Sequence, residues 1–395
     1  MKIKYQKSLA SQSEAGRANI KMTEDITVAV VGSHSALDVC RGAKDEGFKT
    51  LVIAEKGRDK TYAKYYKIEG SPSTHSVRSG PMGCVDEVLY VDKFKDLLSP
   101  RVQKILLSKN CIFIPHRSFE VYINDYDAIE KSFKVPMFGN RRLLRFEERD
   151  QKPNQYDLLE KAGIKYPRIF KSPQEIDRLV IVKVLEKERG FERAFFLADS
   201  QKTYQLKSSK LVKDVKITND ALEKAVIEEF VLGVQVNFNF FYSPINHRLE
   251  LLGTDTRRQT NLDGLLRLPS IWQNQIIDRH RLEVKYEEAG HIAVTVLESL
   301  LEQAYEIGER FVKAAGQMVP PGVIGPFALQ SQIAPGPPKK EIVVFDVSPR
   351  MPGSPGISST PYSAYLYGQS ISMGRRVTME IRQAIGKNRL PEVIT

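Results

Sequence analysis

A short apolar run that ends in glycine is the feature of this chain that most constrains its fold. Residues 26–32 (ITVAVVG) are apolar and β-branched, which indicates a buried strand. The apolar positions of residues 34–46 recur at helical spacing, Gly47 ends that pattern, and residues 49–54 (KTLVIA) form a second strand-like run. In this order the three segments predict a βαβ unit, and therefore a parallel sheet at the start of the chain.

The remaining segments predict an α/β domain followed by an α+β body. Short apolar runs predict two further strands of the first sheet, at residues 88–91 and 111–115, and the loop composition of residues 70–83 lies between them. Beyond the first sheet, the patterns predict helices at 140–161, 221–225, 294–315 and 372–385, and strands at 180–185, 194–198, 226–231, 236–242, 249–252, 327–333 and 342–347. A charged turn at residues 186–193 joins the first two of these strands.

Length and composition suggest several structural units without a membrane segment. With 395 residues and 42% hydrophobic content, the chain exceeds what one compact core usually holds. We expect a flexible extension (1–25), an N-terminal α/β domain (26–139) and two further parts (140–235 and 236–395). No apolar run approaches the roughly 20 residues of a membrane span, and the first residues lack a secretory signal, which predicts a cytoplasmic protein without a membrane partner.

The cysteines and the net charge indicate which kinds of site and partner to expect. Cys40, Cys84 and Cys111 are odd in number and lack metal-ligand spacing, which indicates reduced thiols rather than disulfides or a zinc site. A formal net charge of +11 favours anionic partners. Because the chain shows no nucleic-acid-binding module, we expect small phosphorylated metabolites and no nucleic acid.

Two polar loops are expected at one edge of the first sheet. His34 follows the first strand directly and Ser118 follows the run at 111–115, so the carboxyl ends of parallel strands place both at the same edge. Backbone N–H groups at the start of a helix favour a phosphate there. The alternative is that Ser33, Ser35 and Ser118 only cap helices on the surface.

Charged side chains in the middle of the chain indicate a second anion site. Lys183 lies in an otherwise apolar strand, where a buried ammonium needs a compensating anion such as a nucleotide phosphate. Glu228 and Glu229 precede the apolar edge residue Val231, an arrangement suited to contacts with a purine ring and its ribose. Solvated side chains on an exposed face are the alternative for all three charged residues.

The last predicted hairpin offers oxygen ligands for a metal. Gln330 and Asp346 lie on neighbouring strands joined by a Pro/Gly turn, so hairpin pairing would bring their oxygen atoms together. Hard oxygen ligands on adjacent strands suit Mg²⁺ that bridges nucleotide phosphates, and Mn²⁺ could replace it. A neutral glutamine makes this site weaker than two carboxylates would.

Nine segments of the chain point to a known family. They are, in order, GSHSALDVCRGAKDEGF, PHRSF, VPMFGNRRLLRFE, VIVK, IEEFVLG, FFYSPI, NLDGLLRLP, VPPGVIGPFALQ and SMGRR. In these segments, from residue 26 to residue 395, the chain resembles the archaeal, formate-dependent 5-formaminoimidazole-4-carboxamide ribonucleotide (FAICAR) synthetases of the ATP-grasp superfamily. The resemblance implies a domain that precedes the ATP-grasp body, then the small and large ATP-grasp subdomains, and a homo-oligomer.

The resemblance also implies a carbon–nitrogen ligase of purine biosynthesis. ATP would phosphorylate formate, and the 5-amino group of 5-aminoimidazole-4-carboxamide ribonucleotide (AICAR) would attack the formyl phosphate, giving FAICAR, ADP and phosphate. The positions that match the family's functional residues are His34, Ser118 and Asn261 for AICAR, Lys183 and Glu229 for ATP, and Gln330 and Asp346 for the metal. We expect Glu228 and Val231 to complete the ATP site, and Lys183 and Asp346 to be the catalytic residues.

The chain departs from the family pattern in three places. Residues 185–193 replace a glycine-rich loop, Arg117 replaces a glycine, and Gln330 and Asp346 replace two glutamates. The altered loop and the altered metal positions favour a rival hypothesis. The rival is a catalytically weakened or re-purposed relative that binds purine nucleotides as a regulatory or assembly protein.

Overall fold

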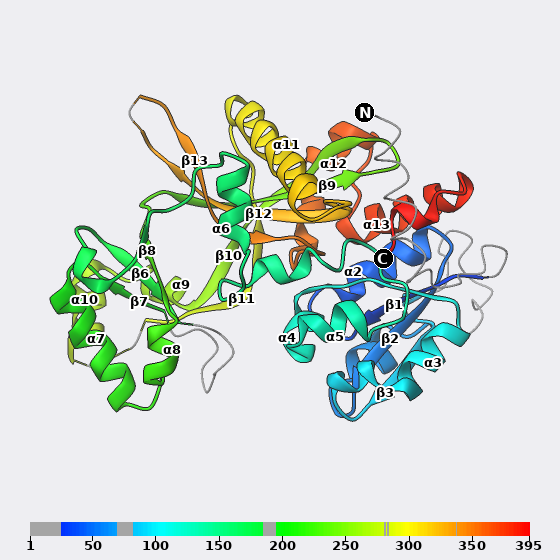
Figure 1. Ribbon diagram of the computed structural model, residues 1–395, viewed down its shortest axis with the longest axis horizontal. Helices are drawn as coiled ribbons and strands as arrows, with labels where there is room; N and C mark the ends of the chain where they lie inside the picture. The colour runs from blue at the N-terminus through cyan, green and yellow to red at the C-terminus, as the bar shows by residue number, and fades with distance from the viewer. Residues whose placement is uncertain (1–24, 69–81, 185–194, 280–281, 283, 337) are drawn as a thin grey trace.

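The described residues of the protein form three sheets with their helices, arranged in a row. The computed structural model describes residues 25–68, 82–184, 195–279, 282, 284–336 and 338–395. Figure 1 shows a small green sheet with its helices at one end, a blue parallel sheet at the other, and a long antiparallel sheet between them. The expected extension (apart from Asp25), most of the loop at 70–83 and the charged turn at 186–193 lie outside the described residues.

The N-terminal sheet is parallel, as the βαβ pattern predicts. Its strands are ordered β3-β2-β1-β4, and β1 pairs in parallel with both β2 and β4. Helix α2 (Ala36–Asp45) connects β1 to β2, and Gly47 follows it with φ +78°. The four strands are β1 (Thr27–Val31), β2 (Lys49–Glu55), β3 (Glu87–Val91) and β4 (Cys111–Phe113).

Both faces of this sheet are buried. In β1, Val28 and Val30 pack into one apolar cluster, whereas Ala29 and Val31 pack into another. This alternation with period two explains why the strand reads as a continuous apolar run. One face is covered by α3 (Pro100–Ser108), α4 (Arg117–Ile123) and α5 (Tyr126–Lys131), and the other by α2 and α13 (Met373–Gly386).

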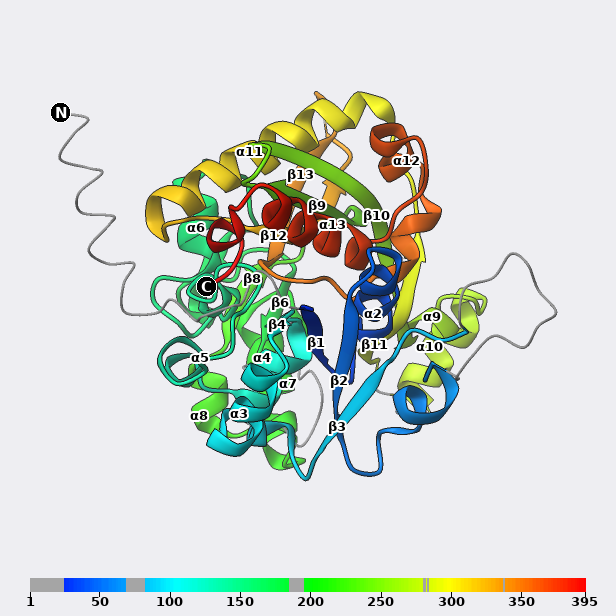
Figure 2. The ribbon, with the colours of Figure 1, turned by 90° about the vertical axis from the view of Figure 1, so that its right-hand side faces the viewer.

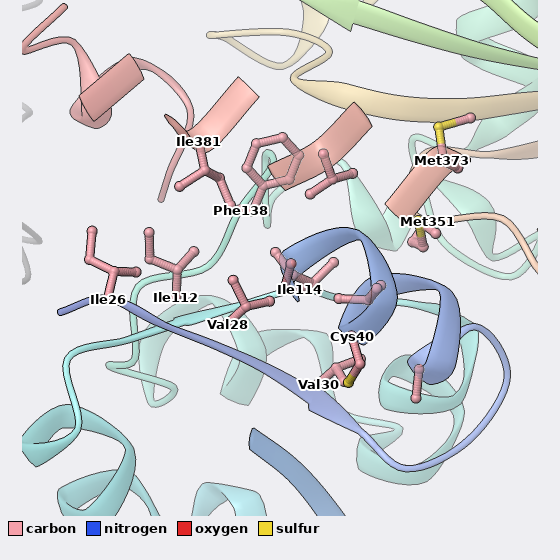
Figure 3. Packing of buried hydrophobic residues seen from close by; sticks show 14 of the residues in the cluster. Ile26, Val28, Val30, Cys40, Ile112, Ile114, Phe138, Met351, Met373 and Ile381 are labelled. Carbon is pink, nitrogen blue, oxygen red and sulfur yellow. The ribbon is translucent and has the colours of Figure 1, made fainter. Parts of the chain in front are cut away.

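Helix α13 packs directly on α2, although more than 300 residues separate them in the sequence. Figure 3 shows Ile381 and Met373 of α13 in the same cluster as Val28 and Ile112 of the sheet. The helix backbones touch, since a Cβ on Gly42 would lie 2.2 Å from the backbone nitrogen of Arg375. Figure 2 shows α13 between the parallel sheet and the long antiparallel sheet.

The central sheet has five antiparallel strands, ordered β11-β10-β9-β12-β13. Phe238 and Phe240 of β9 pack against α6 (Gln155–Lys161) and α11 (Leu301–Met318), whereas the alternating Asn237 and Asn239 face a cavity on the other side. The strands are β9 (Val234–Ser243), β10 (Arg248–Asn261), β11 (Tyr286–Ala293), β12 (Gly325–Ala334) and β13 (Glu341–Ser348).

The third sheet is small and antiparallel, with the order β5-β8-β6-β7. Its apolar face packs against α7 (Gln201–Lys213) and residues of α8 (Asn219–Glu223). The predicted pairing of residues 180–185 with 194–198 is confirmed by the antiparallel strands β6 (Val180–Lys183) and β7 (Phe195–Ala198). The other two strands are β5 (Ile169–Phe170) and β8 (Val226–Glu229).

Two predicted helices begin later than expected. The structure has only a 3₁₀ turn at Leu144–Glu147 and helix α6 within residues 140–161, because Pro153 interrupts the helical pattern. Within 294–315 the helix is α11, which begins at Leu301 and follows a 3₁₀ turn. The structure adds helices that the patterns did not predict. They are α3, α4, α5 and α7, described above, together with α9 (Leu262–Leu265), α10 (Ser270–Arg279) and α12 (Tyr362–Tyr367).

The predicted fold class, a parallel-sheet domain followed by an α+β body, is confirmed by these sheets. Cys40, Cys84 and Cys111 are buried free thiols, as expected. Within the described residues, no helix has both the length and the apolar character that crossing a membrane requires. The domain boundaries near residues 139 and 235 stay predictions.

Candidate active site

A polar cavity of about 380 Å³ lies where the three sheets meet. Its walls come from the loop after β1, the start of α4, strand β6 and the face of the central sheet opposite α11. His34, Ser118, Lys183, Gln330 and Asp346 all line this one cavity. Five residues that the sequence singled out are therefore brought together by elements far apart in the chain.

The two polar loops of the parallel sheet meet at its carboxyl edge. The Ser118 hydroxyl donates to the Ser33 hydroxyl at 3.0 Å. The ring of His34 stacks on that of His116, with centroids 5.3 Å apart, and His116 Nε2 donates to the Val31 carbonyl at 2.9 Å. These contacts confirm that the loops share one edge and give the cavity its wall on the side of the first sheet.

The helix-capping alternative for the serines of this edge is wrong for Ser35. No side-chain hydrogen bond caps α2, and the Ser35 hydroxyl instead donates to the Pro352 carbonyl at 3.0 Å. The loop that follows β13 thereby closes over His34. A Cβ on Gly353 would lie 2.5 Å from His34 Nε2, so only glycine allows this approach.

Lys183 is buried, and the alternative of a solvated face is wrong. Only 7% of Lys183 is exposed, and its Nζ lies 2.6 Å from a Glu228 carboxylate oxygen. The Tyr156 hydroxyl donates to the same carboxylate, and Arg149 Nε lies 3.8 Å from it. Burial lowers the pKa of the Lys183 ammonium, and the Glu228 carboxylate opposes that change. The cavity thus contains a cation that a buried acid holds in place.

Gln330 and Asp346 face each other across the β12–β13 hairpin, as predicted. Arg149 Nη2 donates to an Asp346 oxygen at 2.6 Å, and Arg257 donates to the Gln330 amide oxygen. Within the described part of the chain, no cluster of three or more His, Cys, Asp or Glu side chains could hold a metal ion. Any ion at this position would depend on Asp346 and on oxygen atoms of a substrate.

The other predicted site residues lie away from the cavity surface. Glu228 is buried behind Lys183, and Glu229 pairs with Arg178 at 3.2 Å on the outside of the small sheet. Val231 and Asn261 do not line the cavity, and the Asn261 side-chain oxygen accepts from the backbone nitrogen of Lys285 at 3.0 Å. Their roles in binding ATP or AICAR stay predictions.

The central sheet contributes a group of polar residues that the sequence did not single out. Asp255, only 1% exposed, accepts from Asn237 at 2.9 Å, from Asn239 at 2.6 Å and from His291 at 2.5 Å. His291 Nε2 also lies 2.7 Å from Glu288. Burial disfavours the charged ring, but hydrogen bonds to Asp255 and Glu288 outweigh it and raise the pKa of His291 to about 9. His291 is therefore a cation at neutral pH.

A second group of charges joins the parallel sheet to the central sheet. Arg117 pairs with Glu148 at 2.8 Å, and Arg350 pairs with Glu147 at 2.6 Å. Burial and the neighbouring Glu147 raise the pKa of Glu120, which lies beneath both arginines. Arg117 therefore adds a paired guanidinium to the cavity wall.

Comparisons with known proteins place the chain in a family. Two family models match it, a domain of unknown function (DUF1297) at residues 203–395 and a protein of unknown function (DUF1246) at residues 28–170. A 5-formaminoimidazole-4-carboxamide-1-(beta)-D-ribofuranosyl 5'-monophosphate synthetase from Methanothermobacter thermautotrophicus is 41% identical over 375 residues, which cover 94% of this chain and 95% of the relative.

Solved structures agree with this assignment. The structure of an IMP biosynthesis protein PurP from Thermococcus kodakaraensis matches with a TM-score of 0.68 and 29% identity, covering 93% of this chain and 100% of that chain. An ADP complex of purK, an N5-carboxyaminoimidazole ribonucleotide synthetase, matches with a TM-score of 0.55 over 88% of this chain and 78% of that chain. At 11% identity, the second likeness concerns the fold alone.

The three-sheet architecture and the matching synthetases identify the chain as an ATP-grasp carbon–nitrogen ligase. Within that class, the chain belongs to the family of 5-formaminoimidazole-4-carboxamide-1-(beta)-D-ribofuranosyl 5'-monophosphate synthetases.

Proposed function

We propose that this chain is an ATP-dependent ligase that transfers a formyl group from formate to the 5-amino group of AICAR in purine biosynthesis. The products are FAICAR, ADP and phosphate. One observation carries the proposal, which is that a single cavity has His34 and Ser118 on one wall and Lys183 and Asp346 on the other. The name of the curated relatives, which match along nearly the whole chain, supports the same reaction.

In the proposed reaction, an oxygen of formate attacks the γ-phosphorus of ATP, and the bond to ADP breaks to give formyl phosphate. The 5-amino nitrogen of AICAR then attacks the formyl carbon, the carbon–oxygen bond to phosphate breaks, and the amine loses one proton. Both steps depend on alignment of anionic reactants rather than on a nucleophilic side chain. A cavity between sheets suits this chemistry, because it keeps the reactive acyl phosphate away from bulk water.

Two cationic side chains of the cavity, Lys183 and Arg149, are suited to neutralise phosphate charge in this reaction. Lys183 is fixed by Glu228 at 2.6 Å and faces the cavity, so it can neutralise a phosphate without first being ordered. Arg149 is fixed in the same way by Asp346. We assign the ribonucleotide to the wall of His34 and Ser118, opposite these cations.

The donor set fits one divalent ion. Mg²⁺ commonly binds through one or two carboxylates together with substrate phosphates, and Asp346 supplies one carboxylate at the cavity surface. When bound, Mg²⁺ or Mn²⁺ would neutralise charge on the phosphates of ATP. Formate as the carboxylate, a homo-oligomeric state and a cytoplasmic location belong to the same proposal.

The test is to incubate the purified chain with ATP, Mg²⁺, formate and AICAR, and to measure FAICAR and ADP together. We expect equal amounts of both products, loss of both in Lys183→Ala and Asp346→Ala, and no loss in the exposed control Lys224→Ala. Omitting formate should abolish both products. Binding of ATP or AICAR without product would instead favour a non-catalytic relative.

A further inference from the structure

Two arginines hold the pair of side chains that the sequence suggested as metal ligands. The Gln330 amide oxygen accepts from Arg257 Nη2, and an Asp346 oxygen accepts from Arg149 Nη2 at 2.6 Å. All four side chains line the cavity. Each oxygen-bearing group therefore already faces a guanidinium, but one is a carboxylate and the other a neutral amide.

Gln330 is fixed at both ends of its amide. Its Nε2 donates to the Ser348 hydroxyl at 3.2 Å, while its oxygen accepts from Arg257, and only 6% of the residue is exposed. A flipped amide would point its NH₂ group at the guanidinium, so these two contacts set the orientation. The neutral Gln330 amide oxygen, which already accepts a hydrogen bond from Arg257, is a poor ligand for a metal ion, because the guanidinium and the ion would repel each other.

The neutral charge of Gln330 also matters for Arg257. Arg257 Nε lies 3.2 Å from a Glu288 oxygen, so the guanidinium already has a carboxylate partner. A glutamate at position 330 would add a second carboxylate and offset more of the positive charge that Arg257 presents to the cavity. Glutamine instead orients the guanidinium without offsetting its charge, as a phosphate-binding residue requires.

We propose that Arg257 is a catalytic residue that binds the transferring phosphoryl group, that Gln330 is its positioning residue, and that the site holds one divalent ion, on Asp346. This inference rests on the proposed function, because it assumes ATP phosphates in the cavity. It assigns the charge neutralisation next to position 330 to an arginine rather than to a second metal ion.

The first test counts metal ions. Mn²⁺ bound to the full chain is measured by electron paramagnetic resonance at saturating β,γ-imido analogue of ATP. We expect one ion per chain in the wild type, two in Gln330→Glu, and one in Gln235→Glu, which adds the same charge to the sheet at a position that does not line the cavity. Two ions in the wild type, or one in Gln330→Glu, would overturn the inference.

The second test separates turnover from binding. Arg257→Lys keeps the charge but loses the planar fork that contacts Gln330 and a phosphate together. We expect kcat to fall about 100-fold, the size typical of one lost transition-state donor, with KM for ATP changed less than about threefold. The control Arg258→Lys changes the next arginine of the strand, which pairs with Asp263 and does not line the cavity, and it should keep the wild-type kcat.

Variants of Gln330 distinguish positioning from a merely structural role. Gln330→Met keeps the side-chain length but cannot accept from Arg257, and we expect it to lower kcat about 10-fold with KM for ATP unchanged. Wild-type kcat in both Arg257→Lys and Gln330→Met would refute the roles assigned here. If the wild type makes no FAICAR but binds one Mn²⁺ with the nucleotide analogue, the proposed function fails and the metal count stands.

Discussion

Replacing Lys183 with methionine should destabilise the protein strongly, because it leaves the Glu228 carboxylate buried without its closest cation. Their side chains are only 8% and 1% exposed, and the charged atoms lie 2.6 Å apart. Removing one partner of a buried ion pair costs about 3–5 kcal/mol. Because the Tyr156 hydroxyl and Arg149 still face Glu228, we expect a loss of about 3 kcal/mol, at the lower end of that range.

The double variant Lys183→Met/Glu228→Gln tests this reasoning. It removes both charges and keeps an amide oxygen for the Tyr156 hydroxyl, so we expect a loss of only about 1 kcal/mol relative to the wild type. Urea unfolding gives the free energies, and calorimetry should show that neither variant binds ATP. A loss below about 1 kcal/mol in Lys183→Met, or a double variant as unstable as the single one, would refute the argument.

The remaining predictions concern pH and close packing. The pKa of His291 is raised, so its contribution to the free energy of unfolding is complete below pH 6.5 and is lost as the pH rises through about 9. In urea unfolding, His291→Asn should remove up to about 3 kcal/mol of this pH-dependent stability. Equal pH profiles of the unfolding free energy in the wild type and the variant would contradict this. Gly42→Ala would place a Cβ 2.2 Å from the backbone of Arg375, so we expect the free energy of unfolding to fall by about 3 kcal/mol. Thermal and urea unfolding measure this change, and an unchanged unfolding midpoint would contradict the close contact. Gly353→Ala should displace His34 and raise KM for AICAR about 10-fold, with KM for ATP unchanged, and equal effects on both substrates would argue against this placement of AICAR.

The elements that were predicted best from the sequence are the strands that are buried on both faces. Strands buried on both faces, such as residues 27–31, read as apolar runs, and their order with one helix determines a parallel sheet. The helix predicted at 140–161 was too long, because Leu143 and Leu144 pack into the apolar clusters at the start of a short 3₁₀ turn and so resemble the apolar positions of a longer α-helix.

The site was predictable where an unusual residue interrupts an apolar pattern, as Lys183 does. Asp255 and His291 were not found, because the predicted strand at 249–252 ends before Asp255 and no strand was predicted at 286–293, where charged residues hide the strand pattern of β11. Their signal was present in the alternation of β9, where Asn237 and Asn239 occupy the face opposite the buried phenylalanines. That pattern shows a polar face, but the fold is needed to show that this face is covered.

The packing of α13 on α2 has a consequence for how the chain is made. The ribosome delivers β1 and α2 early, but the helix that covers their apolar cluster follows more than 300 residues later. Until then Val28, Val30 and Ile112 lack part of the cover that Met373 and Ile381 provide (Figure 3). The first sheet is therefore synthesised well before the helix that completes its packing, so a nascent chain without α13 exposes an apolar surface of the kind that chaperones bind.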